Sequence, residues 1–128
     1  MDARIRELGT AEPRGNLGRR LEKSVGGESR HLAAALAEGD EAARRILAET
    51  AADLGFGLSH AVHLAHPEAI ILGGGLSNVG EPLRAAVERA LNGFLMEAFL
   101  PGPKVLLSAL GDDAVPVGAL LLAGGDTR

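Results

Sequence analysis

Hydrophobic and polar residues along this chain form two kinds of block, long amphipathic stretches and short runs that are wholly apolar. The short runs at 69–73 and 105–107 are rich in branched aliphatic side chains and too short for helices, which predicts buried strands, the first covered on both faces. The longer stretches predict helices over residues 28–38, 40–66, 80–98 and 114–123. The order helix, helix, strand, helix, strand, helix predicts parallel strands with crossover helices, an α/β fold.

The second helix is the longest predicted element. Gly39 ends the helix before it, Asp40 is placed to cap it, and Pro67 stops it because proline disfavours helical geometry in the preceding residue. Gly55 and Gly57 each cost about 1 kcal/mol relative to alanine inside a helix, and close packing against another element would explain that cost. The predicted apolar stripe of this helix consists of Leu47, Ala51, Leu54, Leu58, Ala61 and Ala65.

Three consecutive glycines, Gly73, Gly74 and Gly75, follow the first predicted strand. They remove every Cβ where the strand gives way to the next helix, so a ligand can approach the backbone closely. Ligands of open α/β sheets bind at the carboxyl ends of the strands. A tight strand-to-helix turn without a ligand is the alternative interpretation. After the glycines, Asn78 and Glu81 have the spacing of a capping box, and Pro82 suits the first turn of a helix.

Two strands make a small sheet. Sheets usually have about four to six strands, and an apolar strand edge at 69–73 would be an aggregation hazard. We therefore expect either a part of a larger fold or a sheet that another chain completes.

The amino-acid composition excludes several classes of protein function. The chain has no cysteine, which excludes disulfides, thiolate metal sites and a cysteine nucleophile. Residues 1–30 carry seven Lys and Arg against five Asp and Glu without interleaved aromatic residues, which argues against nucleic-acid binding. The start lacks an apolar signal region, and no apolar run approaches the roughly 18 residues that span a bilayer. The expected location is the cytoplasm.

Four segments follow one another in a fixed order: Gly39-Asp40, Leu54 to Leu58, His66 to Gly75, and Leu110 to Ala119. Together they resemble the ROK family, which contains bacterial sugar kinases of the glucokinase type and related transcriptional repressors. The resemblance covers residues 28–124 and implies an actin-like ATPase (ribonuclease H-like) fold of two lobes, of which this chain matches the end of the second. Residues 28–128 would then be the carboxyl-terminal lobe, and residues 1–27 an irregular remnant of the sugar-site segment.

The resemblance also implies ligands for particular residues. The loop Gly73, Gly74, Gly75 would lie against the adenosine side of ATP, which the parent enzyme would use with Mg²⁺. The segment from Gly15 to Glu22 resembles the glycine-rich segment beside the sugar site. Glu22 matches the glutamate that hydrogen-bonds sugar hydroxyls, and a solvated surface charge explains it equally well. Arginine and leucine stand where many members have zinc-binding cysteines, so no zinc is expected.

Two other groups of polar residues are candidates for metal binding. His60, His63 and His66 follow one another in three-residue steps of about 300°, so the third leaves the face of the first, and polar packing is favoured over a metal site. For Asp112 and Asp113, a turn and helix cap are favoured over a Mg²⁺ site.

The sequence has no phosphate-loop motif, no family motif around a catalytic aspartate and no Glu-x-Gly-His sugar segment. Phosphoryl transfer needs a cradle for the phosphates, a metal and a base. We therefore predict the carboxyl-terminal lobe of an ATP-dependent hexose kinase that is inactive as an isolated chain. Its partners would be sugar and nucleotide in the parent protein, and a missing amino-terminal lobe or further copies of the chain. The alternatives are an effector or dimerisation module of a ROK repressor, and a free-standing interaction protein that completes its sheet by homodimerisation.

Overall fold

A computed structural model describes Ala3, Glu7 and residues 28–124, and these have an α/β architecture. The predicted order of four helices and two strands is confirmed there, with three short 3₁₀ helices (η) added between them. The predicted remnant at 1–27 lies almost wholly outside the described residues. The elements are α3 (Glu28–Ala37), α4 (Glu41–Ala65), β1 (Ala69–Leu72), η1 (Gly75–Val79), α5 (Glu81–Phe94), η2 (Glu97–Phe99), β2 (Lys104–Leu107), η3 (Gly111–Asp113) and α6 (Ala114–Gly124).

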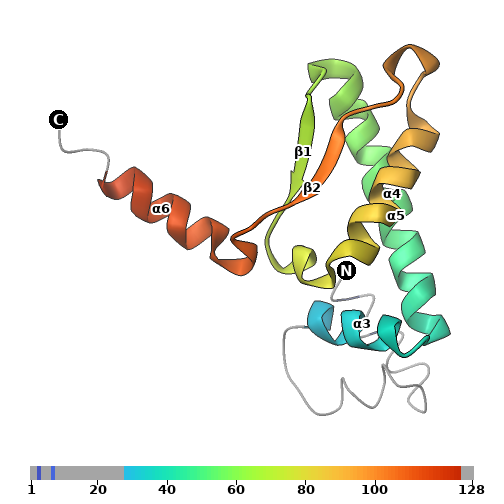
Figure 1. Cartoon of the computed structure of the whole chain (residues 1–128), viewed down its shortest axis with the longest axis vertical. Helices are drawn as coiled ribbons and strands as arrows, with labels where there is room; N and C mark the ends of the chain where they lie inside the picture. The colour runs from blue at the N-terminus through green and yellow to red at the C-terminus, as the bar shows by residue number, and fades with distance from the viewer. Residues whose placement is uncertain (1–2, 4–6, 8–27, 125–128) are drawn as a thin grey trace.

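In the described part of the chain, β1 and β2 form a two-stranded parallel sheet, with Ala69 opposite Lys104 and Leu72 opposite Leu107. Helices α4 and α5 lie on one side of this sheet, and α6 extends away on the other (Figure 1). The prediction that both faces of the first strand are covered is wrong for these residues. Leu72 is buried, but Ile71 is 67% exposed, because successive side chains of a strand point to opposite faces and only one face is packed.

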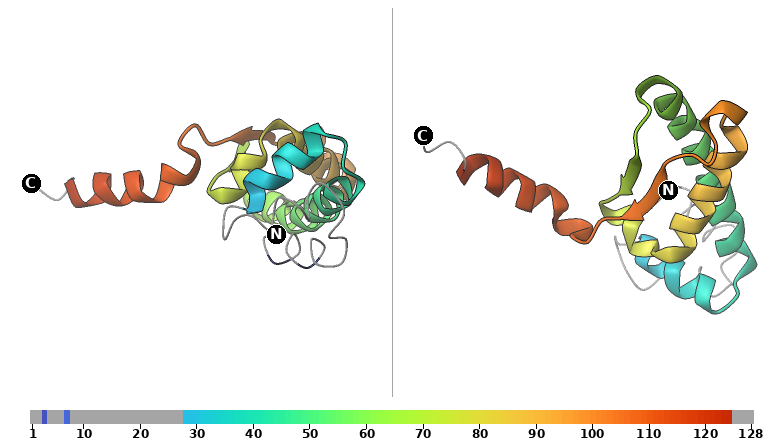
Figure 2. Two further views of the ribbon diagram at one scale, coloured as in Figure 1. Left: turned by 90° about the horizontal axis from the view of Figure 1, so that it is seen from below. Right: turned by 45° about the horizontal axis from the view of Figure 1, so that its top comes forward.

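The core lies between the sheet and the helices and is aliphatic. Helix α3 packs against η1 and against the start of α4 (Figure 2). The predicted stripe of α4 is confirmed from Leu47 to Leu58 and wrong beyond it. Ala51 is buried and Leu47, Leu54 and Leu58 pack against the core, while Ala61 and Ala65 are exposed. The buried face changes direction along α4, since the helix packs against α3 and then against α5. The largest fully buried side chains are Leu32, Ile46, Leu83, Leu91, Val87 and Val105.

The ends of α4 follow the sequence signals. The Asp40 carboxylate accepts a hydrogen bond from the backbone N–H of Ala43 at 3.1 Å, which confirms the predicted N-cap. Gly39 ends α3 with a positive φ of 79°. His66 ends α4 in the left-handed region, and its N–H donates to the carbonyl of Val62 at 2.9 Å.

The capping box predicted for the next helix is wrong. Asn78 belongs to η1, and the residue that caps α5 is Gly80, at φ 78°. The N–H of Gly80 donates to the carbonyl of Ser77 at 3.0 Å and closes the 3₁₀ turn, so α5 starts too late for Asn78 to reach it. Pro82 does occupy the first turn of α5, as predicted.

Arg84 joins α5 to the sheet. Its guanidinium contacts Glu81 and Glu88 at 2.5 and 2.7 Å and donates to the carbonyl oxygen of Val105 at 3.3 Å. The side chain of Arg84 is 24% exposed, whereas that of Glu81 is 67% exposed. The two carboxylates therefore hold the guanidinium in position for its hydrogen bond to β2.

Glu81→Gln is expected to lower stability at neutral pH, and this difference should disappear in acid. The hydrogen bond from Arg84 and then its positive charge hold the pKa of Glu81 below its ordinary value of 4.5. A carboxylate whose pKa is lowered by folding stabilises the fold above its unfolded pKa and loses that effect as the pH falls through the folded pKa. Urea unfolding of both proteins from neutral pH to about pH 3 measures the difference. In an Arg84→Met background, Glu81→Gln should change the stability much less at neutral pH. An equally large change in that background would contradict the assignment of the effect to Arg84.

Candidate functional site

The carboxyl ends of β1 and β2 meet at one edge of the sheet, and each strand runs into a short loop. The chain after β1 passes through Gly73 and Gly74 into η1, and the chain after β2 passes through Ser108 into η3. The backbone N–H of Ser108 donates to the carbonyl of Leu72 at 2.8 Å, which holds the two loops together beyond the strands. The helical turns η1 and η3 also contact each other. This edge is where open parallel sheets bind ligands.

The glycine loop has a backbone that other residues adopt with difficulty. Gly74 has φ 70° and ψ −166°, a region that is essentially restricted to glycine. The loop is held by Ser77, which is buried and donates to the carbonyl of Gly74 from its N–H at 3.0 Å and from its hydroxyl at 2.7 Å. A Cβ added to Gly74 would meet no atom within 4 Å. The loop therefore presents bare main chain toward open space.

The structure brings together some of the residues that the sequence singled out. The glycines lie at the predicted edge of the sheet, and η3 forms the predicted turn at 111–113. The two loops approach each other where a Cβ on Gly111 would lie 4.0 Å from Oδ1 of Asn78. Glu22 lies outside the described residues, so the structure does not place it relative to this edge.

Sequence reasoning missed Ser108. A Cβ on Gly73 would lie 3.5 Å from Cβ of Ser108, and the Ser108 hydroxyl accepts a hydrogen bond from the N–H of Leu110 at 3.2 Å. The signal that identifies it is the strand register. Leu72 is opposite Leu107, so the residues that follow them, Gly73 and Ser108, are also neighbours. Ser108 shapes the second loop beside the glycines.

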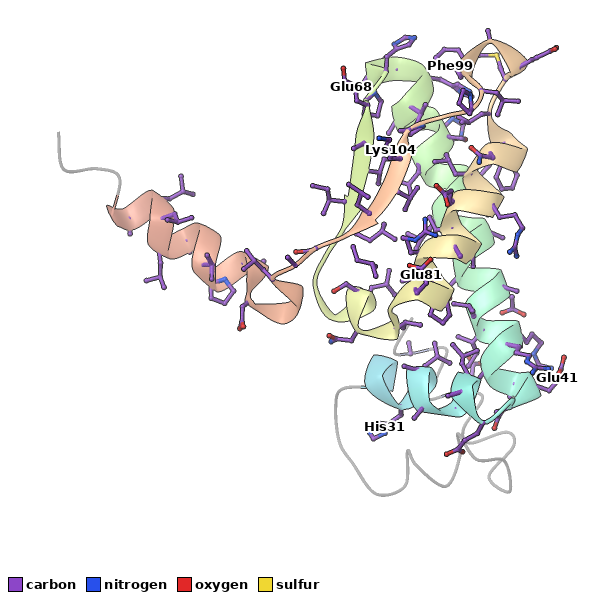
Figure 3. The ribbon with its side chains drawn as sticks, in the orientation of Figure 1. His31, Glu41, Glu68, Glu81, Phe99 and Lys104 are labelled. Carbon is purple, nitrogen blue, oxygen red and sulfur yellow. The ribbon has the colours of Figure 1, made fainter. Side chains whose placement is uncertain are left out.

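Two hollows lie away from this edge, and neither is lined by Gly73, Gly74 or Gly75. A groove of about 290 Å³ lies between α4 and α5. A hollow of about 280 Å³, lined in part by Glu68 and Phe99, lies at the end of the molecule remote from α3 (Figure 3).

The histidines of α4 and its C-cap residue, His66, pack against phenylalanine rings. His60 lies edge-on to Phe56 at 4.7 Å between ring centroids, while His63 and His66 contact Phe99 at 4.7 and 4.9 Å. Nε2 of His63 also accepts a hydrogen bond from the N–H of Met96 at 3.2 Å. No three His, Asp or Glu side chains gather in a metal-binding arrangement within the described ranges.

Helix α6 is apolar around its circumference and largely uncovered. Its large side chains are 71–80% exposed at Leu120, Leu121, Leu122 and Val115. Among the described residues it contacts mainly the preceding turn η3. A helix that is hydrophobic on every side is normally buried, so this one is suited to packing against another body. Neither α6 nor any other helix in the described ranges combines the length and hydropathy needed to cross a membrane.

Comparison with known proteins decides the family. The model of the ROK family matches residues 16–125. The chain belongs to the ROK family. Glucokinase from Thermotoga maritima is 30% identical to this ROK chain over 92 residues, which are 72% of the chain and 29% of that enzyme.

Solved structures agree with this assignment. The crystal structure of a ROK family glucokinase from Streptomyces griseus, in complex with glucose and AMPPNP, matches with a TM-score of 0.75 and 30% identity. The match covers 94% of this chain and 39% of that one. A putative sugar kinase from Cytophaga hutchinsonii matches with a TM-score of 0.71 at 20% identity, which supports the fold. The predicted fold class is confirmed, since the described part of this ROK chain is a partial actin-like ATPase fold.

The chain is much shorter than these relatives. It spans 29% of the T. maritima glucokinase and 39% of the S. griseus glucokinase. It is therefore related to ROK sugar kinases over one part of their length.

Proposed function

We propose that this chain is the carboxyl-terminal lobe of an ATP-dependent ROK sugar kinase, which transfers the γ-phosphate of ATP to a hexose hydroxyl when the remainder of the enzyme is present. The observation that carries the proposal is the glycine loop. It offers bare main chain at the carboxyl edge of a parallel sheet, in a fold that matches 39% of a glucokinase solved with glucose and AMPPNP.

The described residues fit the adenosine side of a nucleotide. Gly73 and Gly74 carry no side chain, and the space at Gly74 is open, so a flat ligand can lie against the backbone. Bound ATP would supply the phosphoryl group, and Mg²⁺ would neutralise its charge. The role of this chain is to hold the nucleoside, and the other lobe supplies the phosphate cradle and the catalytic base. Glu22 would contact the sugar, within a segment at 1–27 left over from the sugar site.

Two apolar surfaces support an origin in a larger protein. On the open face of the sheet, Ile71 is 67% exposed and lies opposite Leu106, which is 45% exposed. Helix α6 forms the second surface, with Leu122 80% exposed. Exposed apolar areas of this kind mark interaction sites, and the remainder of a kinase would cover both. The chain alone is accordingly proposed to have no kinase activity and to reside in the cytoplasm.

A chimera tests the proposal. The amino-terminal part of the S. griseus glucokinase that this chain does not match would be fused ahead of it, and ATP-dependent phosphorylation of glucose would be assayed. We expect activity from the chimera and none from the chain alone. The matched control is the same chimera with Gly74→Val, which should raise the KM for ATP because a side chain then occupies the nucleotide wall.

The possible outcomes separate the hypotheses. A folded chimera that neither binds ATP nor phosphorylates glucose would overturn the kinase proposal. A chimera that binds glucose and transfers no phosphate would favour the alternative, an effector module of a ROK repressor. Phosphorylation by the chain alone would contradict the proposed dependence on a second lobe.

A further inference from the structure

Ser108 ties the chain after β2 to the end of β1. Its backbone N–H donates to the carbonyl of Leu72 at 2.8 Å, just beyond the last paired position of the sheet. Its hydroxyl oxygen accepts a hydrogen bond from the N–H of Leu110 at 3.2 Å, the local bond that serine side chains often make to the backbone two residues on. One residue therefore holds both the end of the sheet and the residue that precedes η3.

The hydrogen bonds continue from Ser108 into η3. The backbone N–H of Asp113 donates to the carbonyl of Leu110 at 2.9 Å, so both backbone polar groups of Leu110 are bonded. The turn η3 in turn contacts η1, where a Cβ on Gly111 would lie 4.0 Å from Oδ1 of Asn78. Without the Ser108 hydroxyl, the N–H of Leu110 loses this partner, and η3 is held less firmly against η1.

Ser108 also lies directly beside the glycine loop, at the edge of the sheet where both strands end (Figure 1). A Cβ on Gly73 would lie 3.5 Å from Cβ and 4.0 Å from Oγ of Ser108. The next residue, Gly74, faces open space. A nucleoside that lies against Gly74 would therefore have the first loop beneath it and the second loop beside it. The separation of the two loops sets the width of the space that the nucleoside enters.

We propose that Ser108 is a positioning residue for ATP, which holds η3 against η1 so that the two loops keep the separation that the nucleoside requires. This inference rests on the proposed kinase function and adds a residue to its nucleotide site. Ser108 acts through the loops, whereas phosphoryl transfer belongs to the other lobe. Holding the nucleoside contributes equally to the ground state and the transition state, so a weaker hold raises the KM for ATP and leaves kcat unchanged.

Two substitutions of Ser108 test the proposal in the glucokinase chimera. Ser108→Ala removes the hydroxyl and should raise the KM for ATP at least about threefold, the effect of losing one hydrogen bond, while kcat and the KM for glucose change less than about twofold. Ser108→Thr keeps the hydroxyl and should restore the KM for ATP to within about twofold of the unsubstituted chimera. In the full chain by itself, the Leu110 amide should exchange with deuterium faster in Ser108→Ala and not in Ser108→Thr.

Ser59→Ala is the matched control, because it makes the same change away from the two loops. Ser59 is buried in α4, and its hydroxyl donates to the carbonyl of Phe56 at 2.7 Å. This variant should leave the KM for ATP unchanged within about twofold, whatever it does to stability. Circular dichroism melting checks that each chimera is folded.

The outcomes distinguish this inference from the function on which it rests. A folded, unsubstituted chimera that neither binds ATP nor phosphorylates glucose would overturn the kinase proposal and the role of Ser108 with it. An active chimera whose KM for ATP does not respond to Ser108→Ala would overturn the role of Ser108 alone. So would a lower kcat at unchanged KM, which indicates a merely structural role, or an equal rise in the KM for ATP with Ser59→Ala.

Discussion

Replacing Gly55 with alanine is expected to destabilise the protein by roughly 1–2 kcal/mol, because overpacking costs about 1–3 kcal/mol and outweighs the gain in helix propensity. Gly55 is buried where α4 crosses α5. A Cβ at this position would lie 2.7 Å from the backbone nitrogen of Leu91 and 2.8 Å from the backbone carbon of Ala90. Backbone atoms cannot rotate away as a flexible side chain can, so the two helices would have to separate.

Gly57 is the matched control, because it lies two residues away in the same helix. It is exposed, and a Cβ there would meet nothing within 4 Å. Gly57→Ala should therefore stabilise the protein by roughly 0.5–1 kcal/mol, the ordinary advantage of alanine over glycine in a helix. Urea unfolding of the two variants under the same conditions measures both effects. Equal shifts of the same sign would show that α4 and α5 do not approach closely at Gly55.

Replacing Gly74 with alanine is expected to cost roughly 1–3 kcal/mol of stability, the range for a residue held in a sparsely populated backbone region. Gly74 has φ 70° and ψ −166°, and the carbonyl of this residue receives both hydrogen bonds from Ser77. No atom lies within 4 Å of an added Cβ, so the cost arises from the backbone and not from a clash. In the kinase chimera, the same change should also weaken ATP binding, because the alanine would shift the loop toward a backbone conformation without strain.

Gly73→Ala provides the comparison for the loop. Its Cβ would meet the Cβ of Ser108 at 3.5 Å, an ordinary van der Waals contact, and Gly73 has no positive φ. We expect a change in stability of less than about 0.5 kcal/mol, typical of a substitution that touches no special feature. Urea unfolding of both variants gives the difference. If Gly73→Ala proved as damaging as Gly74→Ala, the backbone strain assigned to alanine at position 74 would be wrong.

The helices were predictable because their signals are local. Asp40 can reach the N–H of Ala43 whatever the rest of the chain does, and proline at position 67 ends α4 in any context. The face that α4 buries was not predictable in the same way. Its neighbours α3 and α5 cover it along different lengths, and Gly55 and Ser59 are buried although neither belongs to the predicted stripe.

The capping box at Asn78 failed for a related reason. The spacing of Asn78 and Glu81 is compatible with a cap, but η1 includes Asn78 in a 3₁₀ turn that ends on Gly80. The turn is held by Ser77, which is buried, and η1 packs against α3. Tertiary packing thus selected one of two local structures that the sequence permits.

The sequence by itself determined the type and order of the helices and strands and the position of the glycine loop. The signals for these features are the spacing of apolar residues, the capping residues and the glycines, and each of them acts over only a few residues. Tertiary structure alone decided what lies beside that loop and which surfaces stay open. Ser108 is a neighbour of Gly73 only through the register of β1 and β2, and the exposure of Ile71 depends on which face of the sheet the helices cover. The physical reason is that burial and strand pairing join residues far apart in the chain, and no local pattern records which partner each residue will meet.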